Sequence, residues 1–329
     1  MVGQENLAPQ FEDDSAKQTW EQYVVWAYRL LLGREPESSA VLNECPYNNR
    51  RELVRAFVAS PEFVSNNGFG LPSDVKLAAH DGYKIYAPRE DELIGSPVLH
   101  GSYEPHVTSV FRRYLKPGMN VIDIGANIGH FSMLAASIVG PDGMVTSVEP
   151  NLENARLLEA SRRLNGFDHV RLVCAAASRD AGMLLLKPDV SNGTTAPVKS
   201  TDELWVSRLV PCIPLGTVLP PGRAVDFIKI DIEGAEYQAL YGCGEVLRRD
   251  APVIVSELSP AALLENSGVT AEDYMEFLLS CKLELAVIGD DGVLIWFGGD
   301  VRGVMNAWSK TNSDHIDIVA APSHVKHLL

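Results

Sequence analysis

The sequence predicts an α/β fold with a mostly parallel sheet. From residue 119 onward, short apolar runs alternate with helical patterns, and the first run ends in a glycine-rich turn that opens a helix. The core strands are expected at 121–125, 145–149, 170–175, 227–231 and 253–257, with helices at 128–139, 151–165 and 234–248. A helix over 271–280 and closing strands over 283–288, 293–297 and 316–320 complete the pattern.

The first 70 residues predict a separate helical unit. Residues 16–32 place apolar side chains on one helical face, and Gly33 is positioned to end that helix. A second apolar stripe begins near Asn49, and residues 66–70 have the glycine and asparagine content of a linker. We therefore expect a helical accessory domain over residues 1–70.

A hairpin and a lead-in helix are predicted between this unit and the sheet. Two short strands, 75–80 and 83–87, flank the turn residues Asp81-Gly82, and 105–115 has a regular helical stripe. The expected divisions of the chain are 1–70, 71–118 and 119–329.

Composition restricts the class of protein. The chain has 46% hydrophobic and 22% charged residues, as ordinary globular proteins do. Its formal net charge of -15 argues against a nucleic-acid backbone or an anionic membrane as the main partner. No apolar run predicts a membrane span, the N-terminus lacks a signal-peptide pattern, and the five scattered cysteines predict neither disulfides nor a zinc site. We expect a cytoplasmic protein and leave open whether it forms a homo-oligomer.

A nucleoside site is predicted by the segment Val121-Ile-Asp-Ile-Gly-Ala-Asn-Ile-Gly129 together with Glu149. Glycines let a backbone approach its ligand, and an acid at the end of the next strand suits ribose hydroxyls. The spacing Gly125-x-x-x-Gly129 differs from the nicotinamide pattern G-x-G-x-x-G. Asp123 would repel a pyrophosphate but suits a ligand that bears an ammonium and a sulfonium. The ligand inferred from these residues is S-adenosylmethionine.

A second charged segment, Phe227-Ile-Lys-Ile-Asp-Ile-Glu-Gly-Ala-Glu236, ends another predicted strand. Charged side chains there are costly unless they pair or face a cleft. We assign Lys229 and Glu236 to interactions that brace the sheet, and Asp231 and Glu233 to the cleft. The sequence predicts no metal site, although these acids leave metal dependence open.

Three other residues have two interpretations each. Asn127 either contacts the ligand or caps a helix, and His130 is either a pocket wall or a base. Glu104, in Gly101-Ser-Tyr-Glu-Pro105, either folds over the ligand or complements a helix N-terminus.

These motifs together resemble the FkbM family of S-adenosylmethionine-dependent methyltransferases. The resemblance rests on Val121–Ser132, Val148-Glu-Pro-Asn151, Ile228–Glu236 and Gly101–Pro105, and it extends over residues 80–321. It implies a class I methyltransferase fold with a seven-stranded, mostly parallel sheet, and O-methylation of a sugar, polyketide or related small molecule. Many relatives carry an Asn where this chain has Cys174-Ala-Ala-Ala-Ser178, so the adenine contact falls to the backbone of Ala175 or Ala176. The residues expected to bind the cofactor are Glu104, Asp123, Gly125, Ala126, Asn127, Gly129, Glu149, Pro150, Asn151 and Ala176.

The N-terminal motifs Tyr28–Pro36 and Leu53–Phe63 are similar to a helical domain often attached to sugar-modifying enzymes, itself distantly similar to phycobilisome linker repeats. This resemblance implies no chemistry.

The expected reaction transfers the methyl group of S-adenosylmethionine to a hydroxyl of a small molecule or glycan, with S-adenosylhomocysteine as product. A base in the cleft would help, and Asp231 is the first candidate, followed by Glu233, His130 and Glu104. Two alternatives stay open: a nicotinamide-dependent oxidoreductase, and a non-catalytic protein that binds a glycan or partner through residues 1–70.

Overall fold

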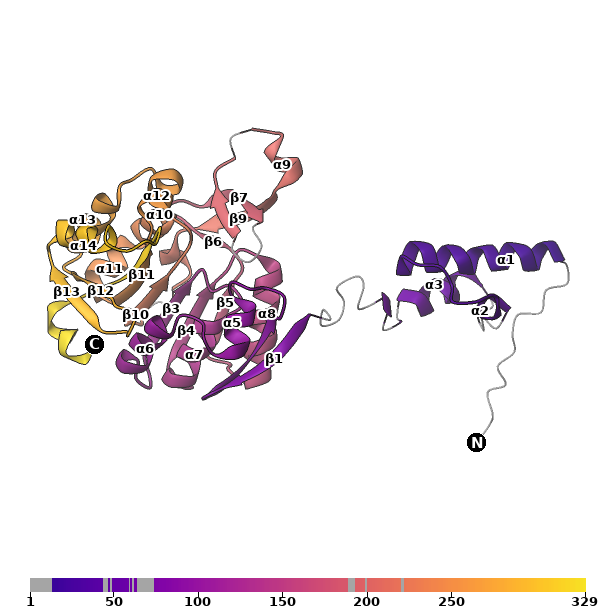
Figure 1. The fold of residues 1–329 in the computed structure, drawn as a ribbon, viewed down its shortest axis with the longest axis horizontal. Coiled ribbons are helices and arrows are strands. Elements are labelled where there is room, and N and C mark those ends of the chain that lie inside the picture. Colours follow the sequence, from indigo (N-terminus) through magenta and orange to yellow (C-terminus); the bar gives the residue numbers. More distant parts are fainter. Residues whose placement is uncertain are drawn as a thin grey trace. The chain divides into compact units, whose positions relative to one another are not determined.

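The computed structural model describes residues 14–43, 47, 49–58, 60, 62–63, 74–188, 193–198, 200–219 and 222–329. The chain divides into two compact units, Met1–Val75 and Lys76–Leu329. Figure 1 traces both, and each unit is described by itself.

The N-terminal unit is helical. Its elements are α1 (Asp14–Ala27), the π-helical turn η1 (Tyr28–Leu32), α2 (Ser39–Asn43) and α3 (Arg50–Val58). Gly33 ends η1 with φ 69, a conformation that glycine adopts without strain. A small core joins α1 to α3 through Trp20, Val24, Leu53 and Phe57.

The second unit begins with the predicted hairpin, β1 (Val75–His80) and β2 (Tyr83–Pro88). Two helices follow, α5 (Gly95–His100) and α6 (Pro105–Tyr114). The sequence analysis predicted α6 but not α5, which is short and has no regular apolar stripe.

An eight-stranded sheet forms the centre of this unit, in the order β13-β12-β14-β11-β10-β3-β4-β5. Its five parallel strands are β3 (Asn120–Ile124), β4 (Met144–Val148), β5 (Val170–Val173), β10 (Phe227–Ile230) and β11 (Val253–Leu258). Three antiparallel strands complete it: β12 (Glu284–Ile288), β13 (Leu294–Gly298) and β14 (Ile316–Ala321). The expected α/β fold with a mostly parallel sheet is thus present, but the expected number of seven strands is wrong, because β13 pairs with β12 and adds an edge strand.

Helices pack on both faces of the sheet. On one face, Ile122 and Ile228 join a core with Leu240 and Tyr274, and on the other Phe227 packs against Phe111 of α6. Apart from the short α9 described below, the helices after β3 are α7 (His130–Val139), α8 (Leu152–Asn165), α10 (Glu236–Tyr241), α11 (Gly244–Asp250), α12 (Pro260–Ala262), α13 (Ala271–Ser280) and α14 (Val301–Trp308). Short helical turns are η2 (Leu215–Thr217), η3 (Leu263–Ser267) and η4 (Ser323–Leu328).

One predicted helix, 234–248, is in fact two, α10 and α11. The chain breaks at Gly242, where an added Cβ would lie 2.5 Å from the Ser178 carbonyl oxygen. Two backbone segments therefore meet too closely there for a side chain, and Cys243 leaves the helical conformation with φ -122.

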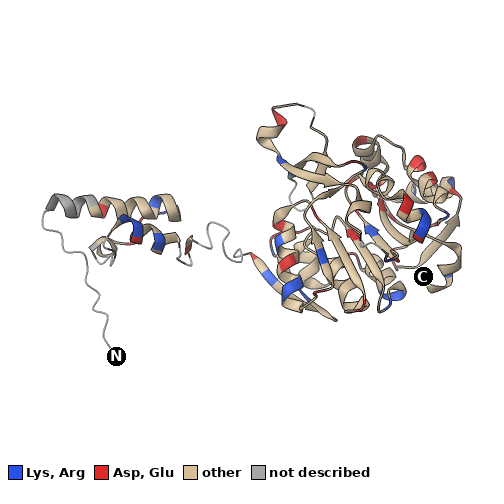
Figure 2. Cartoon of the chain, turned by 180° about the vertical axis from the view of Figure 1, so that it is seen from behind, with Lys and Arg blue, Asp and Glu red and all other residues tan. Residues whose placement is uncertain are grey.

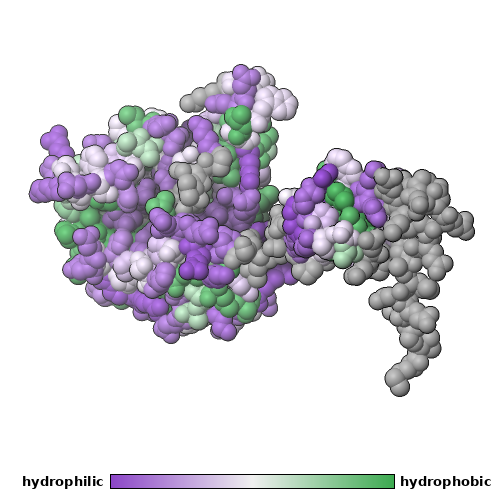
Figure 3. All heavy atoms as spheres, turned by 45° about the vertical axis from the view of Figure 1, so that its right-hand side comes forward, coloured by the Kyte–Doolittle hydropathy of each residue, from purple (hydrophilic) through white to green (hydrophobic). Residues whose placement is uncertain are grey.

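A second, four-stranded sheet projects from the unit, in the order β6-β9-β7-β8. Its strands are β6 (Ala176–Ala177), β7 (Gly182–Pro188), β8 (Gly193–Ala196) and β9 (Arg208–Ile213), with the short helix α9 (Glu203–Val206) before β9. The face seen in Figure 3 is mainly hydrophilic, with some hydrophobic side chains where this sheet projects. Within the described residues, no helix has the length and hydropathy of a membrane span.

Candidate functional site

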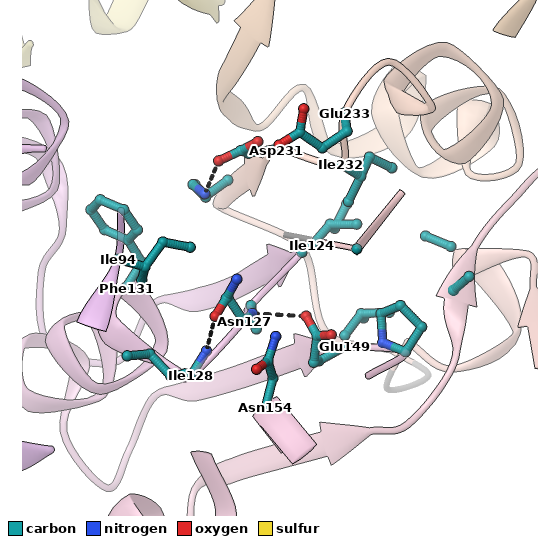
Figure 4. A pocket seen from close by; sticks show the side chains of 18 of the residues that line it. Ile94, Ile124, Asn127, Ile128, Phe131, Glu149, Asn154, Asp231, Ile232 and Glu233 are labelled. Atoms are coloured by element: carbon teal, nitrogen blue, oxygen red, sulfur yellow. Dashed lines mark hydrogen bonds and ion pairs between the residues drawn. The ribbon is translucent and has the colours of Figure 1, made fainter. Parts of the chain in front are cut away.

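A pocket opens where β3, β4 and β10 end, at the carboxyl edge of the parallel strands. Ligands bind at this edge in open α/β sheets. The cavity measures about 780 Å³, including the solvent space at its mouth. We call the wall that contains Asn127, Glu149 and Ala176 the β4 side, and the wall that contains Tyr103, Lys229, Asp231 and Glu233 the β10 side. Figure 4 shows Asn127 and Glu149 across the cavity from Asp231 and Glu233.

The glycine turn after β3 forms the floor of the pocket. Gly125 has φ 78, and an added Cβ would lie 2.0 Å from the carbonyl oxygen of Asp231. Its N–H donates to the Val148 carbonyl at 3.0 Å. The turn thus needs glycine because it passes directly against the chain that follows β10.

Glu149 is held in place by backbone donors. Its carboxylate accepts hydrogen bonds from the N–H groups of Asn127 at 2.8 Å and Asn151 at 2.7 Å. The residue is 5% exposed, and this burial raises the pKa of Glu149 to about 7, although the two backbone hydrogen bonds lower it. Both carboxylate oxygens keep further lone pairs for a ligand.

Most of the predicted cofactor residues line the pocket: Gly125, Ala126, Asn127, Glu149, Pro150 and Ala176. Four others, Glu104, Asp123, Gly129 and Asn151, do not. The Asn151 side chain accepts from the Glu153 N–H and so caps α8, while Gly129 begins α7 at φ 94, where an added Cβ would meet Leu158 at 2.6 Å. In the structure, both residues therefore stabilise the ends of helices.

Asp123 lies beneath the pocket. It is 1% exposed, and the Ser132 hydroxyl donates to its Oδ2 at 2.5 Å. Burial raises the pKa of Asp123, although Lys229 and Ser132 lower it. Asp123 does not line the cavity, so its effect on a ligand would be electrostatic.

Lys229 is a buried ammonium among carboxylates. Its Nζ lies 3.0 Å from Asp231 Oδ2, and both residues line the pocket. Burial lowers the pKa of Lys229, but Asp231, Glu104 and Asp123 together raise it above its ordinary value. The lysine therefore stays charged and holds the β10 side together.

The turn after β10 carries the next two acids. Glu233 lines the pocket from a left-handed conformation, φ 55. Glu236 points back and accepts from the N–H groups of Ile232 at 2.9 Å and Gly234 at 3.2 Å. Glu236 thus braces the turn, as predicted.

His130 lines the pocket, but its environment disfavours a base. Burial, and to a lesser extent nearby His80 and Lys229, lower the pKa of His130 to about 3. Its Nδ1 lies 3.2 Å from the Tyr83 hydroxyl. An imidazole with so low a proton affinity stays neutral and is a weak base near pH 7.

Part of the wall was not predicted residue by residue from the sequence. Ile94, Tyr103, Asn154, Gly193 and Thr195 line the pocket. Tyr103 stands in the motif that drew attention to Glu104, and its aromatic ring was the available signal. Ile94 and Thr195 come from segments far from the motifs, so no local pattern marks them. Among the described residues, no group of three or more His, Cys, Asp or Glu side chains is arranged to hold a metal ion.

Comparison with known proteins agrees with this geometry. Residues 123–284 match the family model described as "Methyltransferase FkbM domain". This match supports an S-adenosylmethionine-dependent methyltransferase in this part of the chain. The match does not reach the N-terminal unit, so its similarity to phycobilisome linker repeats stays a prediction. No curated protein matches the sequence.

Solved structures resemble the chain only weakly. The methyltransferase FkbM from Methylobacillus flagellatus KT is 14% identical over 89% of this chain, with a TM-score of 0.42, and the chain spans 58% of that protein's length. An S-adenosylmethionine-dependent O-methyltransferase from Thermotoga maritima is 14% identical over 67% of this chain and 65% of its own, with a TM-score of 0.37. Aeropyrum pernix fibrillarin with bound S-adenosyl-L-methionine is 14% identical over 75% of this chain and 99% of its own, with a TM-score of 0.37. Such low similarity says nothing about the substrate.

Proposed function

We propose that residues 76–329 form an S-adenosylmethionine-dependent O-methyltransferase that acts on a hydroxyl group of a sugar, a glycan or a natural-product small molecule. The observation that carries this proposal is the buried Glu149 carboxylate, held beside the glycine turn by two backbone N–H groups. A carboxylate oriented in this way suits the two neighbouring hydroxyls of a ribose.

The rest of the pocket suits the other parts of this cofactor. On the β4 side, Ile128, Val148 and Ala176 offer apolar contact for an adenine ring. On the β10 side, carboxylates favour the positive charges of an ammonium and a sulfonium. When bound, S-adenosylmethionine supplies the activated methyl group.

The charges of the β10 side restrict the acceptor. Asp231 and Glu233 line it, and the cationic side chain among the described lining residues is that of Lys229. Such a wall repels an acceptor that carries a phosphate but can hydrogen-bond a neutral hydroxyl. The task of these residues is to align the acceptor oxygen with the methyl carbon and the sulfur, and to exclude water.

The order of charges along the chain agrees with a small-molecule acceptor. In the ribbon of Figure 2, the Lys and Arg positions of the described residues are interspersed with Asp and Glu positions. A nucleic-acid partner would favour a gathered basic surface. This supports a small molecule or glycan over nucleic acid.

Calorimetric titration of the full chain with S-adenosylmethionine, S-adenosylhomocysteine and NADH tests the cofactor. We expect saturable binding of the first two and none of NADH; the reverse would replace this proposal with an oxidoreductase. Mass spectrometry then tests the acceptor with methyl glycosides, oligosaccharides, macrolide alcohols and matching sugar phosphates. Methylation of a neutral hydroxyl is expected, and transfer only to nitrogen or to phosphorylated sugars would contradict it.

A further inference from the structure

The loop before α6 brings an aromatic hydroxyl to the β10 side of the pocket. Tyr103 lines the cavity, and its ring is fixed against His130 at 5.5 Å and Phe131 at 6.0 Å between ring centroids. Its phenol interacts with the carboxylate of the next residue, Glu104, toward which the O–H can donate while the phenolic oxygen keeps its lone pairs for a ligand.

Glu104 occupies a strained position. Its backbone is left-handed, with φ 38 and ψ 61, although the following Pro105 favours an extended residue there. Of the five non-glycine residues with positive φ in the described ranges, Asn127 and Glu233 line the pocket and Glu104 adjoins it. Backbone strain that persists in this way concentrates at functional sites.

The Glu104 side chain does not perform the usual role of an acid at a helix start. It is the N-cap residue of α6, yet it makes no capping hydrogen bond. Its carboxylate instead faces the charged groups of the pocket: Lys229 and Asp231 from the β10 segment, Asp317 from β14, and Tyr103. The charge of Glu104 also helps to raise the pKa of His106, on α6, whose Nε2 lies 2.7 Å from Asp317 Oδ2.

These surroundings give Glu104 the proton affinity of a base that works near neutral pH. Burial raises the pKa of Glu104 to about 7; Lys229 opposes the shift, and Asp231 and Asp317 add to it. Asp231 is engaged elsewhere, since its Oδ2 lies 3.0 Å from the Lys229 Nζ. A base is most effective when its pKa lies near the working pH.

We propose that Tyr103 and Glu104 form the proton relay that deprotonates the acceptor hydroxyl, with Tyr103 as the catalytic residue and Glu104 acting through it. The inference rests on the proposed methyl transfer. As the acceptor oxygen bonds to the methyl carbon, its proton passes to Tyr103 Oη and the phenolic proton passes to the Glu104 carboxylate. The bond from carbon to sulfur breaks, and its electron pair stays on sulfur. Glu104 then returns the proton to solvent, so no oxidant or further reactant is needed.

The test compares Tyr103→Phe, Glu104→Gln and the double variant of the full chain, with the acceptor from the panel above that is methylated fastest. At saturating S-adenosylmethionine, we expect kcat to fall about 10²-fold or more in each single variant. The double variant should be no slower than either, because the two groups act as one unit. The wild-type rate should rise with pH through about 7, and this rise should vanish in Glu104→Gln.

Two controls separate a relay from a structural role. Tyr86→Phe and Glu92→Gln change a half-buried tyrosine and an exposed glutamate outside the pocket, and both should keep the wild-type rate and pH profile. Calorimetry should give unchanged cofactor affinity in all variants. Wild-type rates in Tyr103→Phe, additive losses, or a pH profile that survives Glu104→Gln would overturn the relay and leave the methyltransferase proposal standing. Failure of the wild-type chain to bind S-adenosylmethionine would overturn both.

Discussion

The β4 side of the pocket is built mainly from backbone, and the β10 side from charged side chains. On the β4 side, N–H groups of the glycine turn bond to Val148 and to Glu149, within one stretch of chain. On the β10 side, Lys229 is balanced by carboxylates from three segments, which include Glu104 and Asp123. The first arrangement depends on the close approach of main chains, and the second on charge balance.

This difference predicts that the two sides affect different measured properties. A change on the β4 side should disturb folding or cofactor affinity, because the same hydrogen bonds hold the turn and orient Glu149. A change on the β10 side should disturb the rate, because we propose that its groups face the acceptor. The variants below test that separation, beginning with the largest expected effect.

Gly125→Ala should break the β4 side. The new Cβ would lie 2.0 Å from the Asp231 carbonyl oxygen, in a residue already at φ 78. We expect the free energy of unfolding to fall by about 3 kcal/mol or more, with loss of cofactor binding. Gly118→Ala is the matched control, since Gly118 has φ 87 but nothing within 4 Å of an added Cβ. It should cost only about 1 kcal/mol of strain. Equal losses in denaturant unfolding would show that the close approach at Gly125 is unimportant.

Glu149→Ala should weaken S-adenosylmethionine binding by about 2–3 kcal/mol, roughly 30- to 150-fold. The pKa of Glu149 is about 7 in the free protein, and the ionised form is the better acceptor for two hydroxyls. Affinity should therefore rise from pH 6 to pH 8 in the wild type, and this rise should disappear in the variant. Glu153→Ala removes an acid that is 65% exposed and should change neither quantity in calorimetry. An unchanged affinity in Glu149→Ala would remove the central support of the proposed function.

The contrast between the two sides also explains what could be predicted from sequence. Val121–Gly129 and Glu149 carry the β4 side within about thirty residues, so apolar runs, glycine spacing and one acid were enough to anticipate it.

The β10 side was predicted only in part. Asp231 and Lys229 could be placed because they alternate along one strand. The close contact between Asp317 and His106 could not be predicted, because it depends on the pairing of β14 with β11, far along the chain. The low pKa of His130 could not be predicted from the sequence either, because burial causes it and burial depends on the whole fold.

Asp231→Asn sharpens the distinction between orienting the acceptor and bracing the sheet. Removing the charge leaves Lys229 without its partner at 3.0 Å. We expect kcat to fall about 10- to 100-fold, the scale of a lost charged hydrogen bond, with cofactor affinity nearly intact. The rise of the rate near pH 7 should remain, because Glu104 carries it. Asp168→Asn, at a fully exposed position, serves as the control. A lower Tm with normal turnover would leave Asp231 only its structural role.

The smallest effect is expected from removing the N-terminal unit. Among the described residues, those that line the pocket all lie at or beyond Ile94. The N-terminal helices have a core of their own, formed by residues such as Trp20 and Phe57. A chain that begins at Asp74 keeps β1 whole and should fold with the same Tm for its main transition. It should also bind S-adenosylmethionine within about twofold of the full chain, which is less than 0.5 kcal/mol. A folded, truncated chain with much weaker cofactor binding would mean that the pocket depends on the N-terminal unit. The division of the molecule into an accessory and a catalytic part would then be wrong. If cofactor binding is kept and only turnover of large glycans falls, the N-terminal unit acts on the acceptor, outside the pocket.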